Sequence, residues 1–108
     1  RIYFVTEAYD EAIFDYSEAI RLDPVSAEAF AGRAGVYFKT RQFELAIGDY
    51  EKAIELQPDN ALNYLFLGGS YDAVGVSEKA VENYLIHIDL AGEEANAIAT
   101  ERIEVLND

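Results

Sequence analysis

His87 is the only histidine of the 108-residue chain, and histidine is the side chain best suited to acid–base chemistry near neutral pH. Asn83 and Asp89 lie close to it in the sequence, which suggests an acid–base pair or a metal site. A zinc site, however, needs three or four ligands, and a catalytic histidine needs a nucleophile and an orienting group. The chain supplies neither set, so we expect His87 to pack against the last helix in a structural role.

Carboxylates greatly outnumber basic groups: 21 Asp and Glu residues stand against 8 Lys and Arg residues, which gives a formal net charge of -13. Many of them lie between apolar positions of predicted helices and are expected to face solvent, among them Glu44, Asp49, Glu51 and Glu55. Such a surface argues against nucleic-acid binding, which needs clustered Lys and Arg. It favours basic partners at long range.

The composition excludes several other chemistries. The chain has no cysteine, and therefore no thiolate metal site, redox pair or thiol nucleophile. Its glycines follow no predicted strand, so they do not form a phosphate-binding loop. No segment approaches the ~18 uninterrupted apolar residues of a membrane helix, and no basic signal-peptide start is present. We therefore expect no enzymatic activity, cofactor, metal or membrane insertion, and the missing cysteine suits a cytoplasmic location.

A repeat of 34 residues is the dominant feature of the sequence. Shifted by this length, the chain superimposes alanines, tyrosines, isoleucines and prolines on their like: Ala12, Ala46 and Ala80; Tyr16, Tyr50 and Tyr84; Ile20, Ile54 and Ile88; Pro24 and Pro58. The shift divides a single domain into a partial repeat at 1–26, whole repeats at 27–60 and 61–92, and a different segment at 93–108.

Within each copy the apolar residues recur every three or four positions, which predicts one buried stripe on an amphipathic helix. The two prolines mark helix boundaries, and Ser26 and Asn60 after them are candidates for N-caps. The pattern predicts no strand, and helices at 1–6, 9–22, 27–40, 43–56, 61–73, 77–90 and 94–107. A single helical hairpin cannot bury its apolar stripe alone, so neighbouring hairpins must stack into a solenoid.

A 34-residue hairpin with aromatic, Leu-Gly, Tyr, Ala, aromatic, Ala and Pro positions at these spacings resembles the tetratricopeptide repeat. The copy at 27–60 carries Phe30, Ala34, Tyr37, Phe43, Ala46, Tyr50, Ala53 and Pro58, and the next carries Tyr64, Leu67, Gly68, Tyr71, Gly75, Ala80 and Tyr84. The resemblance covers about residues 1–92. It implies an all-α, right-handed superhelix of antiparallel helix pairs with a capping helix at 93–108.

Three residues depart from the pattern of the resembled family. Arg33 replaces the usual Leu, His87 replaces Ala and Gly92 replaces Pro. Looser packing is therefore expected around Arg33, and a different turn around Gly92. The small residues Ala34 and Gly68 fit the pattern and are expected where two helix axes approach closely.

The resemblance also implies a concave groove, lined by the first helix of each repeat, that holds an extended or helical peptide of a partner protein. By the register of the family, the groove residues are Phe4, Ala31, Gly35, Phe38, Lys39, Leu62, Leu65, Gly69 and Asp72. This lining is largely apolar, so the expected ligand is a hydrophobic or amphipathic segment. The glycines would let a ligand backbone approach closely.

A carboxylate clamp for chaperone tails, which is known in this family, is not expected in this chain. The residues in its slots cannot donate a side-chain hydrogen bond: they are Ala31, Gly32, Gly35, Leu62 and Phe66. Two functions remain open. The chain is either a protein-binding scaffold or adaptor, or a structural segment that associates with itself or with further repeats through the stripe of Ile13, Tyr16 and Ile20.

Overall fold

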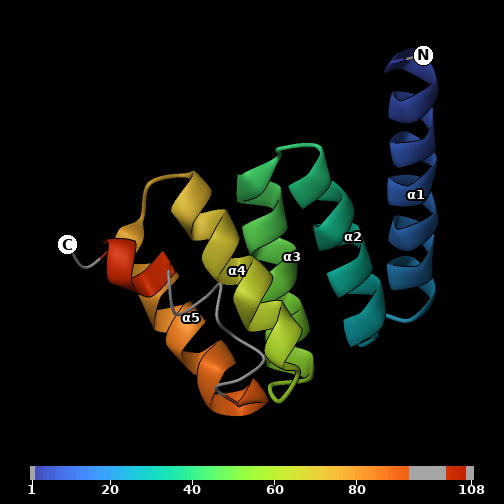
Figure 1. The fold of residues 1–108 in the computed structure, drawn as a ribbon. Helices are drawn as coiled ribbons and strands as arrows, with labels where there is room; N and C mark the ends of the chain where they lie inside the picture. Colours follow the sequence, from blue (N-terminus) through green and yellow to red (C-terminus); the bar gives the residue numbers. More distant parts are fainter. Residues whose placement is uncertain (1, 93–101, 107–108) are drawn as a thin grey trace.

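In the computed structural model the chain forms consecutive antiparallel helices that stack side by side (Figure 1). They are α1 (Ile2–Leu22), α2 (Ala27–Lys39), α3 (Phe43–Leu56), α4 (Ala61–Ala73) and α5 (Ser77–Ala91), and residues 102–106 form a further short helix. The structure describes residues 2–92 and 102–106, with side chains from residue 8 onward. These residues contain no strand, and the predicted all-α repeat solenoid is confirmed.

The predicted boundaries of α2 to α5 agree with the structure to within one residue. Both predicted N-caps are present, because the Ser26 hydroxyl accepts a hydrogen bond from the Ala29 amide at 3.2 Å and the Asn60 side-chain oxygen accepts one from the Leu62 amide at 3.2 Å. Each cap satisfies an amide at the start of its helix that has no carbonyl partner within the helix. Most of the capping helix predicted at 94–107 lies outside the described residues.

α1 is one continuous helix, and the prediction of separate helices at 1–6 and 9–22 is wrong. In the whole repeats the chain turns at a residue with positive φ, Arg41 at 63° and Gly75 at 85°. The corresponding residue, Glu7, remains helical. A left-handed conformation costs a non-glycine residue about 1–2 kcal/mol, which helix packing must offset. In α1 the helix propensity of Glu7 and Ala8 favours a continuous helix instead.

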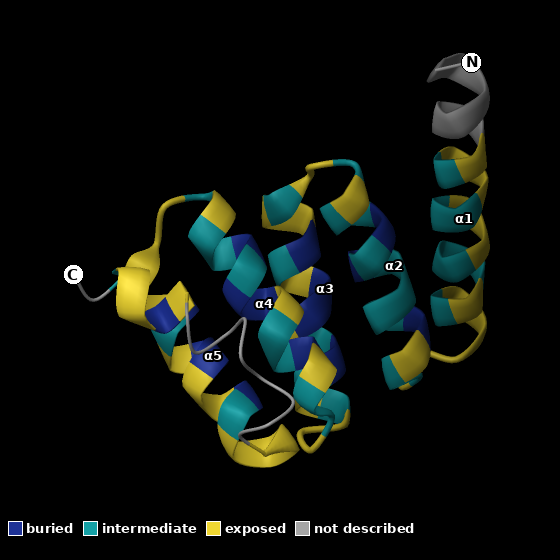
Figure 2. Ribbon diagram, in the orientation of Figure 1, coloured by how far each residue is buried: buried dark blue, intermediate teal, exposed yellow. Residues whose placement is uncertain are grey.

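The core follows the repeated small residues and tyrosines. Ala34, Ala46 and Ala80 have no exposed surface, and Tyr50 and Tyr84 are buried beside them. Figure 2 shows the buried faces of α2, α3 and α4 turned toward one another. Small side chains let the helix axes approach, and the tyrosine rings fill the space beside each contact.

Two glycines lie where a tyrosine of a neighbouring helix crosses the backbone. A Cβ atom on Gly32 would overlap the ring of Tyr16, which comes from α1. A Cβ atom on Gly68 would lie 2.8 Å from the ring of Tyr84 and 3.2 Å from the carbonyl oxygen of Ala80. The spacing of α1 from α2, and of α4 from α5, therefore depends on the absence of a side chain at these positions.

Arg33 joins three helices, whereas looser packing was expected around it. Its Nε and Nη2 atoms donate to the Asp49 carboxylate of α3 at 2.7 and 2.9 Å, and its Nη1 donates to Ser17 Oγ of α1 at 3.0 Å. These hydrogen bonds to Asp49 raise the pKa of Arg33. Asp49 is buried, so the prediction that it faces solvent is wrong. A bidentate pair of this kind fixes both distance and orientation.

Gly68→Ala is expected to lower the free energy of unfolding by about 1–3 kcal/mol, because the methyl group would displace Tyr84 or widen the spacing of α4 and α5. Gly48→Ala is the matched control. Gly48 lies within α3, and an added Cβ would meet nothing within 4 Å. That substitution should raise the free energy of unfolding by about 0.5–1 kcal/mol through helix propensity. Urea denaturation followed by circular dichroism measures the free energy of unfolding of both variants. Equal changes of the same sign would contradict the explanation that Tyr84 approaches the backbone too closely at Gly68 for a side chain.

Candidate peptide-binding groove

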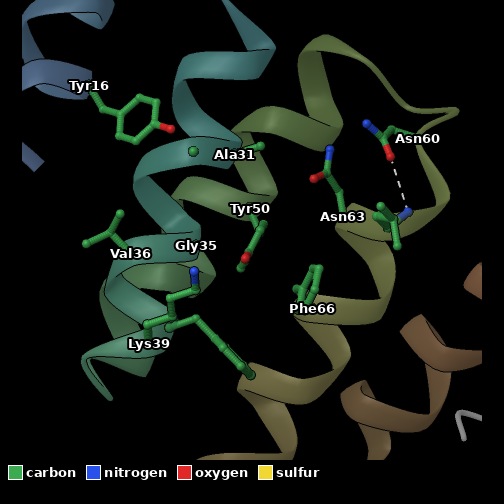
Figure 3. A pocket seen from close by; sticks show the side chains of 12 residues that line it. Tyr16, Ala31, Gly35, Val36, Lys39, Tyr50, Asn60, Asn63 and Phe66 are labelled. Atoms are coloured by element: carbon green, nitrogen blue, oxygen red, sulfur yellow. Dashed lines mark hydrogen bonds between the residues drawn. The ribbon is translucent and has the colours of Figure 1, made fainter. Parts of the chain in front are cut away.

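A pocket with a volume of about 460 Å³ lies between α2 and α4, which are the first helices of the two whole repeats (Figure 3). Tyr16 of α1 and Tyr50 of α3 also reach it. The residues that line the pocket are Tyr16, Ala31, Gly32, Gly35, Val36, Phe38, Lys39, Tyr50, Asn60, Leu62, Asn63 and Phe66. We use the name groove pocket for this set.

The groove pocket brings together five residues of the predicted groove, which are Ala31, Gly35, Phe38, Lys39 and Leu62. Gly69 lies just beyond them, since a Cβ atom there would be 3.5 Å from the ring of Phe38. The repeat register therefore places these side chains on one face. Their role in binding stays a prediction.

Leu65 and Asp72 lie elsewhere, in contact with the short helix at 102–106. Leu65 packs against the cluster of Ala80, Tyr84 and Ile103. Asp72 forms an ion pair with Arg102, in which Nη2 donates to Oδ1 at 2.7 Å. These contacts cover part of both side chains, and neither side chain lines the groove pocket. Phe4 falls in the first turns of α1, whose side chains are outside the described residues.

Three large apolar side chains form the walls of the groove pocket. Leu62 is 56% exposed, and Phe66 is also exposed at the mouth. The rings of Phe38 and Phe66 meet edge to face with centroids 5.7 Å apart, and Phe66 stacks on Tyr50 at 6.0 Å. Aromatic contacts of this kind hold the rings in place, so the walls are formed before a ligand arrives.

Two buried polar side chains line the floor of the groove pocket. Asn63 is 4% exposed and Tyr50 is 3% exposed, and neither side chain has a hydrogen-bond partner among the described residues. In Figure 3 the Asn63 side chain leaves α4 on the side that faces α2 and α3. Burial raises the pKa of the Tyr50 hydroxyl to about 12. Buried polar groups nearly always have partners, so these two require an explanation.

The sequence analysis missed Asn63, although the repeat contains a signal for it. Shifted by 34 residues, Asn63 falls on Ala29, which is buried. A polar residue in a column that is otherwise buried and apolar indicates either a hydrogen bond within the fold or a ligand.

Among the residues whose side chains the structure describes, Lys39 is the only charged one that lines the groove pocket, and it is exposed. Within the described part of the chain it has no ion pair. The other cations of the 27–60 repeat have partners elsewhere: Arg33 pairs with Asp49, Lys52 with Glu55 at 3.5 Å, and the guanidinium of Arg41 lies 5.5 Å from the ring centroid of Phe43. The groove therefore carries a single cation.

His87 is held in the fold by a hydrogen bond, which agrees with the predicted structural role. The side chain is buried, and its Nδ1 atom lies 2.8 Å from the Ala61 carbonyl oxygen at the start of α4. Because a carbonyl oxygen only accepts, Nδ1 carries the proton and donates it. His87 therefore fastens α5 to α4, whereas most of the last helix, against which it was expected to pack, lies outside the described residues.

Residues 2–92 and 102–106 contain neither of two other kinds of site. No group of three His, Asp or Glu side chains is placed to hold a metal ion. No helix in that part of the chain combines the length and apolar character needed to cross a bilayer.

Comparison with protein families matches the profile of the tetratricopeptide repeat to residues 27–60, and a second profile, of the TPR repeat, to residues 1–41. The chain belongs to the tetratricopeptide repeat family. The first profile covers the same residues as one of the predicted whole repeats. No sequence among curated proteins matches the chain.

Several solved structures, among them domains of the tetratricopeptide repeat (TPR) type, resemble this chain over nearly its whole length. The first TPR of Spaghetti (RPAP3), bound to the HSP90 peptide SRMEEVD, is 28% identical, with a TM-score of 0.85 over 97% of this chain and 82% of its own. The first TPR domain of human RPAP3 is 28% identical, with a TM-score of 0.82 over 97% and 81%. MamA is 28% identical, with a TM-score of 0.85 over 96% and 60%. The chain thus spans 60% of the MamA chain.

Asn63→Leu is expected to raise the free energy of unfolding of the ligand-free protein by about 1–2 kcal/mol, because it removes a buried amide without a partner. Asn83→Leu is the matched control, since the buried Asn83 donates from Nδ2 to the Lys79 carbonyl oxygen at 2.8 Å. Losing that bond should destabilise the protein by about 1 kcal/mol. Thermal unfolding of the two variants measures the contrast. A destabilised Asn63→Leu protein would show that the amide contributes to the fold.

Proposed function

We propose that this TPR domain is a protein–protein interaction module that binds a hydrophobic or amphipathic peptide or helix of a partner protein between α2 and α4, as a scaffold or adaptor. The groove pocket is the observation that carries this proposal, since Phe38, Leu62 and Phe66 form apolar walls around a polar floor. The structure of a 28% identical TPR domain with an HSP90 peptide supports a peptide-binding role. The proposed role is binding and not catalysis.

The walls of the groove pocket favour apolar side chains on the ligand. Burying a large apolar side chain fully contributes about 1.5–3 kcal/mol, and Leu62 and Phe66 have exposed surface to offer. Gly35 has no side chain, so a ligand main chain can approach α2 closely. The net charge of -13 attracts a partner with basic residues outside the contact.

The acidic peptide bound by the Spaghetti domain represents a different ligand class. SRMEEVD carries two Glu residues and a C-terminal Asp. The groove pocket of this chain offers one cation, Lys39, and presents Ala31, Gly35 and Leu62 where a carboxylate clamp needs donors. Desolvated carboxylates without paired donors are costly. A ligand with apolar and uncharged polar groups therefore fits better.

Self-association through α1 is the alternative function. No residue between positions 8 and 22 of α1 is buried, and Phe14 is 64% exposed (Figure 2). The stripe of Ile13, Tyr16 and Ile20 is half-buried. The rest of this helix surface is open to a second copy or to a further repeat.

Leu62→Glu is expected to weaken peptide binding by at least about tenfold, because it places a carboxylate in the apolar wall of the groove pocket. The probe is the most enriched peptide from a random 12-residue phage-display library selected on the immobilised wild-type domain. Its dissociation constants are measured by fluorescence anisotropy. Leu85→Glu is the control, because Leu85 is similarly exposed, at 53% against 56%, but lies on α5 outside the pocket.

Equal weakening by the two variants would contradict the groove assignment. Sedimentation equilibrium of the same proteins tests the alternative. A dimer that Phe14→Glu disrupts, together with no enrichment of peptides, would favour self-association through α1 over peptide binding.

A further inference from the structure

We propose that the floor of the groove pocket recognises an amide group of the ligand, supplied either by a Gln or Asn side chain or by a peptide bond of the main chain. This inference rests on the proposed peptide-binding function and adds the chemistry by which the groove selects a ligand. It concerns Asn63 and Tyr50, neither of which belongs to the groove register predicted from the family resemblance.

Asn63 is the first polar group on the floor of the groove pocket. Its side chain is 96% buried, lines the pocket and has no partner among the described residues. An Asn side chain offers two N–H donors and a carbonyl acceptor. The neighbouring Asn60 is in a different situation, because its Oδ1 atom accepts from the Leu62 amide as the N-cap of α4. Asn60 therefore contributes a hydrogen bond to the fold, whereas the Asn63 side chain forms none with the described residues.

Tyr50 supplies the second polar group on the floor. A Cβ atom on Gly35 would lie 3.7 Å from the Tyr50 hydroxyl oxygen, so this oxygen lies beneath the part of α2 that has no side chain. Stacking on Phe66 holds the ring in position. The hydroxyl can donate and accept, and it too has no partner among the residues that the structure describes. Burial raises the pKa of this hydroxyl to about 12.

An amide complements this floor better than the other common groups do. A carboxylate only accepts, so the Asn63 carbonyl would stay unpaired, and the one nearby cation, Lys39, is solvent-exposed. An ammonium group only donates and would leave the Asn63 N–H groups unpaired. An aliphatic group would leave both the N–H groups and the carbonyl of Asn63 unpaired. An amide presents one C=O and at least one N–H without a net charge, so it can pair with donor and acceptor at once.

Small-molecule probes in an NMR titration of the full ¹⁵N-labelled chain test this inference. Isobutyramide carries a primary carboxamide, N-methylisobutyramide carries a peptide-like amide, and isobutyrate carries a carboxylate on the same apolar body. At least one amide should shift the Asn63 side-chain N–H₂ and Gly35 amide signals saturably, with affinity about fivefold above that of isobutyrate. Stronger binding of isobutyramide would identify a Gln or Asn side chain as the source, and stronger binding of N-methylisobutyramide a main-chain group.

Two substitutions that keep the shape of the pocket complete the test. Asn63→Leu and Tyr50→Phe should each lower amide affinity about fivefold, whereas Asn83→Leu, which removes a buried Asn outside the pocket, should leave it unchanged. Isobutyrate binding as tightly as both amides, or unchanged amide binding by Asn63→Leu, would overturn the inference. If selected peptides still bind the wild type in that case, the amide inference fails and the proposed function stands. If amides shift the Asn63 signals but no peptide binds, the floor binds amides as inferred and the proposed peptide-binding function fails.

Discussion

The close approach of paired helices at small residues, each contact filled by a tyrosine ring, is the constraint on which the rest of the structure depends. Ala34 against α3 and Gly68 against α5 set the spacing within each hairpin, and the hairpins set where α2 and α4 lie. Tyr50 connects this packing to the candidate site, because its ring belongs to the core and its hydroxyl lies at the groove pocket. The shape of the groove pocket therefore follows from the spacing of the helices in the two repeats.

Polar contacts supplement this packing where the small-residue pattern is interrupted. Arg33 stands where the family usually has Leu, and its bonds to Asp49 and Ser17 tie α2 to both neighbours. His87 stands where the family has Ala, and its bond to the Ala61 carbonyl ties α5 to α4. In both cases the polar side chain forms a hydrogen bond with a neighbouring helix. Asn63 and Tyr50 differ because their polar groups have no hydrogen-bond partner among the described residues. The groove pocket is therefore a better candidate for ligand recognition than the surroundings of Arg33 or His87.

The helices were predictable where local signals and tertiary packing agree. Pro58 and the N-cap Asn60 mark the end of one hairpin and the start of the next, and the structure places α4 there. At Glu7 the two disagree: the repeat register predicts a turn, while the residue itself favours a helix. The chain follows the local propensity at this residue, and α1 continues through it.

The candidate site was predictable only in part, for a similar reason. Ala31, Gly35 and Phe38 share a face because the repeat register alone determines which side of α2 they occupy. The surroundings of Leu65 and Asp72 depend on where the short helix at 102–106 lies, and the pairing of Arg102 with Asp72 follows from no periodicity. The importance of Asn63 depends on the absence of a partner in space, which a sequence does not display.

The most direct test of this account is to measure intermolecular nuclear Overhauser effects between the labelled domain and a bound peptide selected on it. The account predicts contacts from apolar side chains of the peptide to the ring protons of Phe38 and Phe66 and to the methyl groups of Leu62. Contacts concentrated on Phe14 of α1, with none to those three residues, would place the binding surface on the other side of the solenoid and would contradict it.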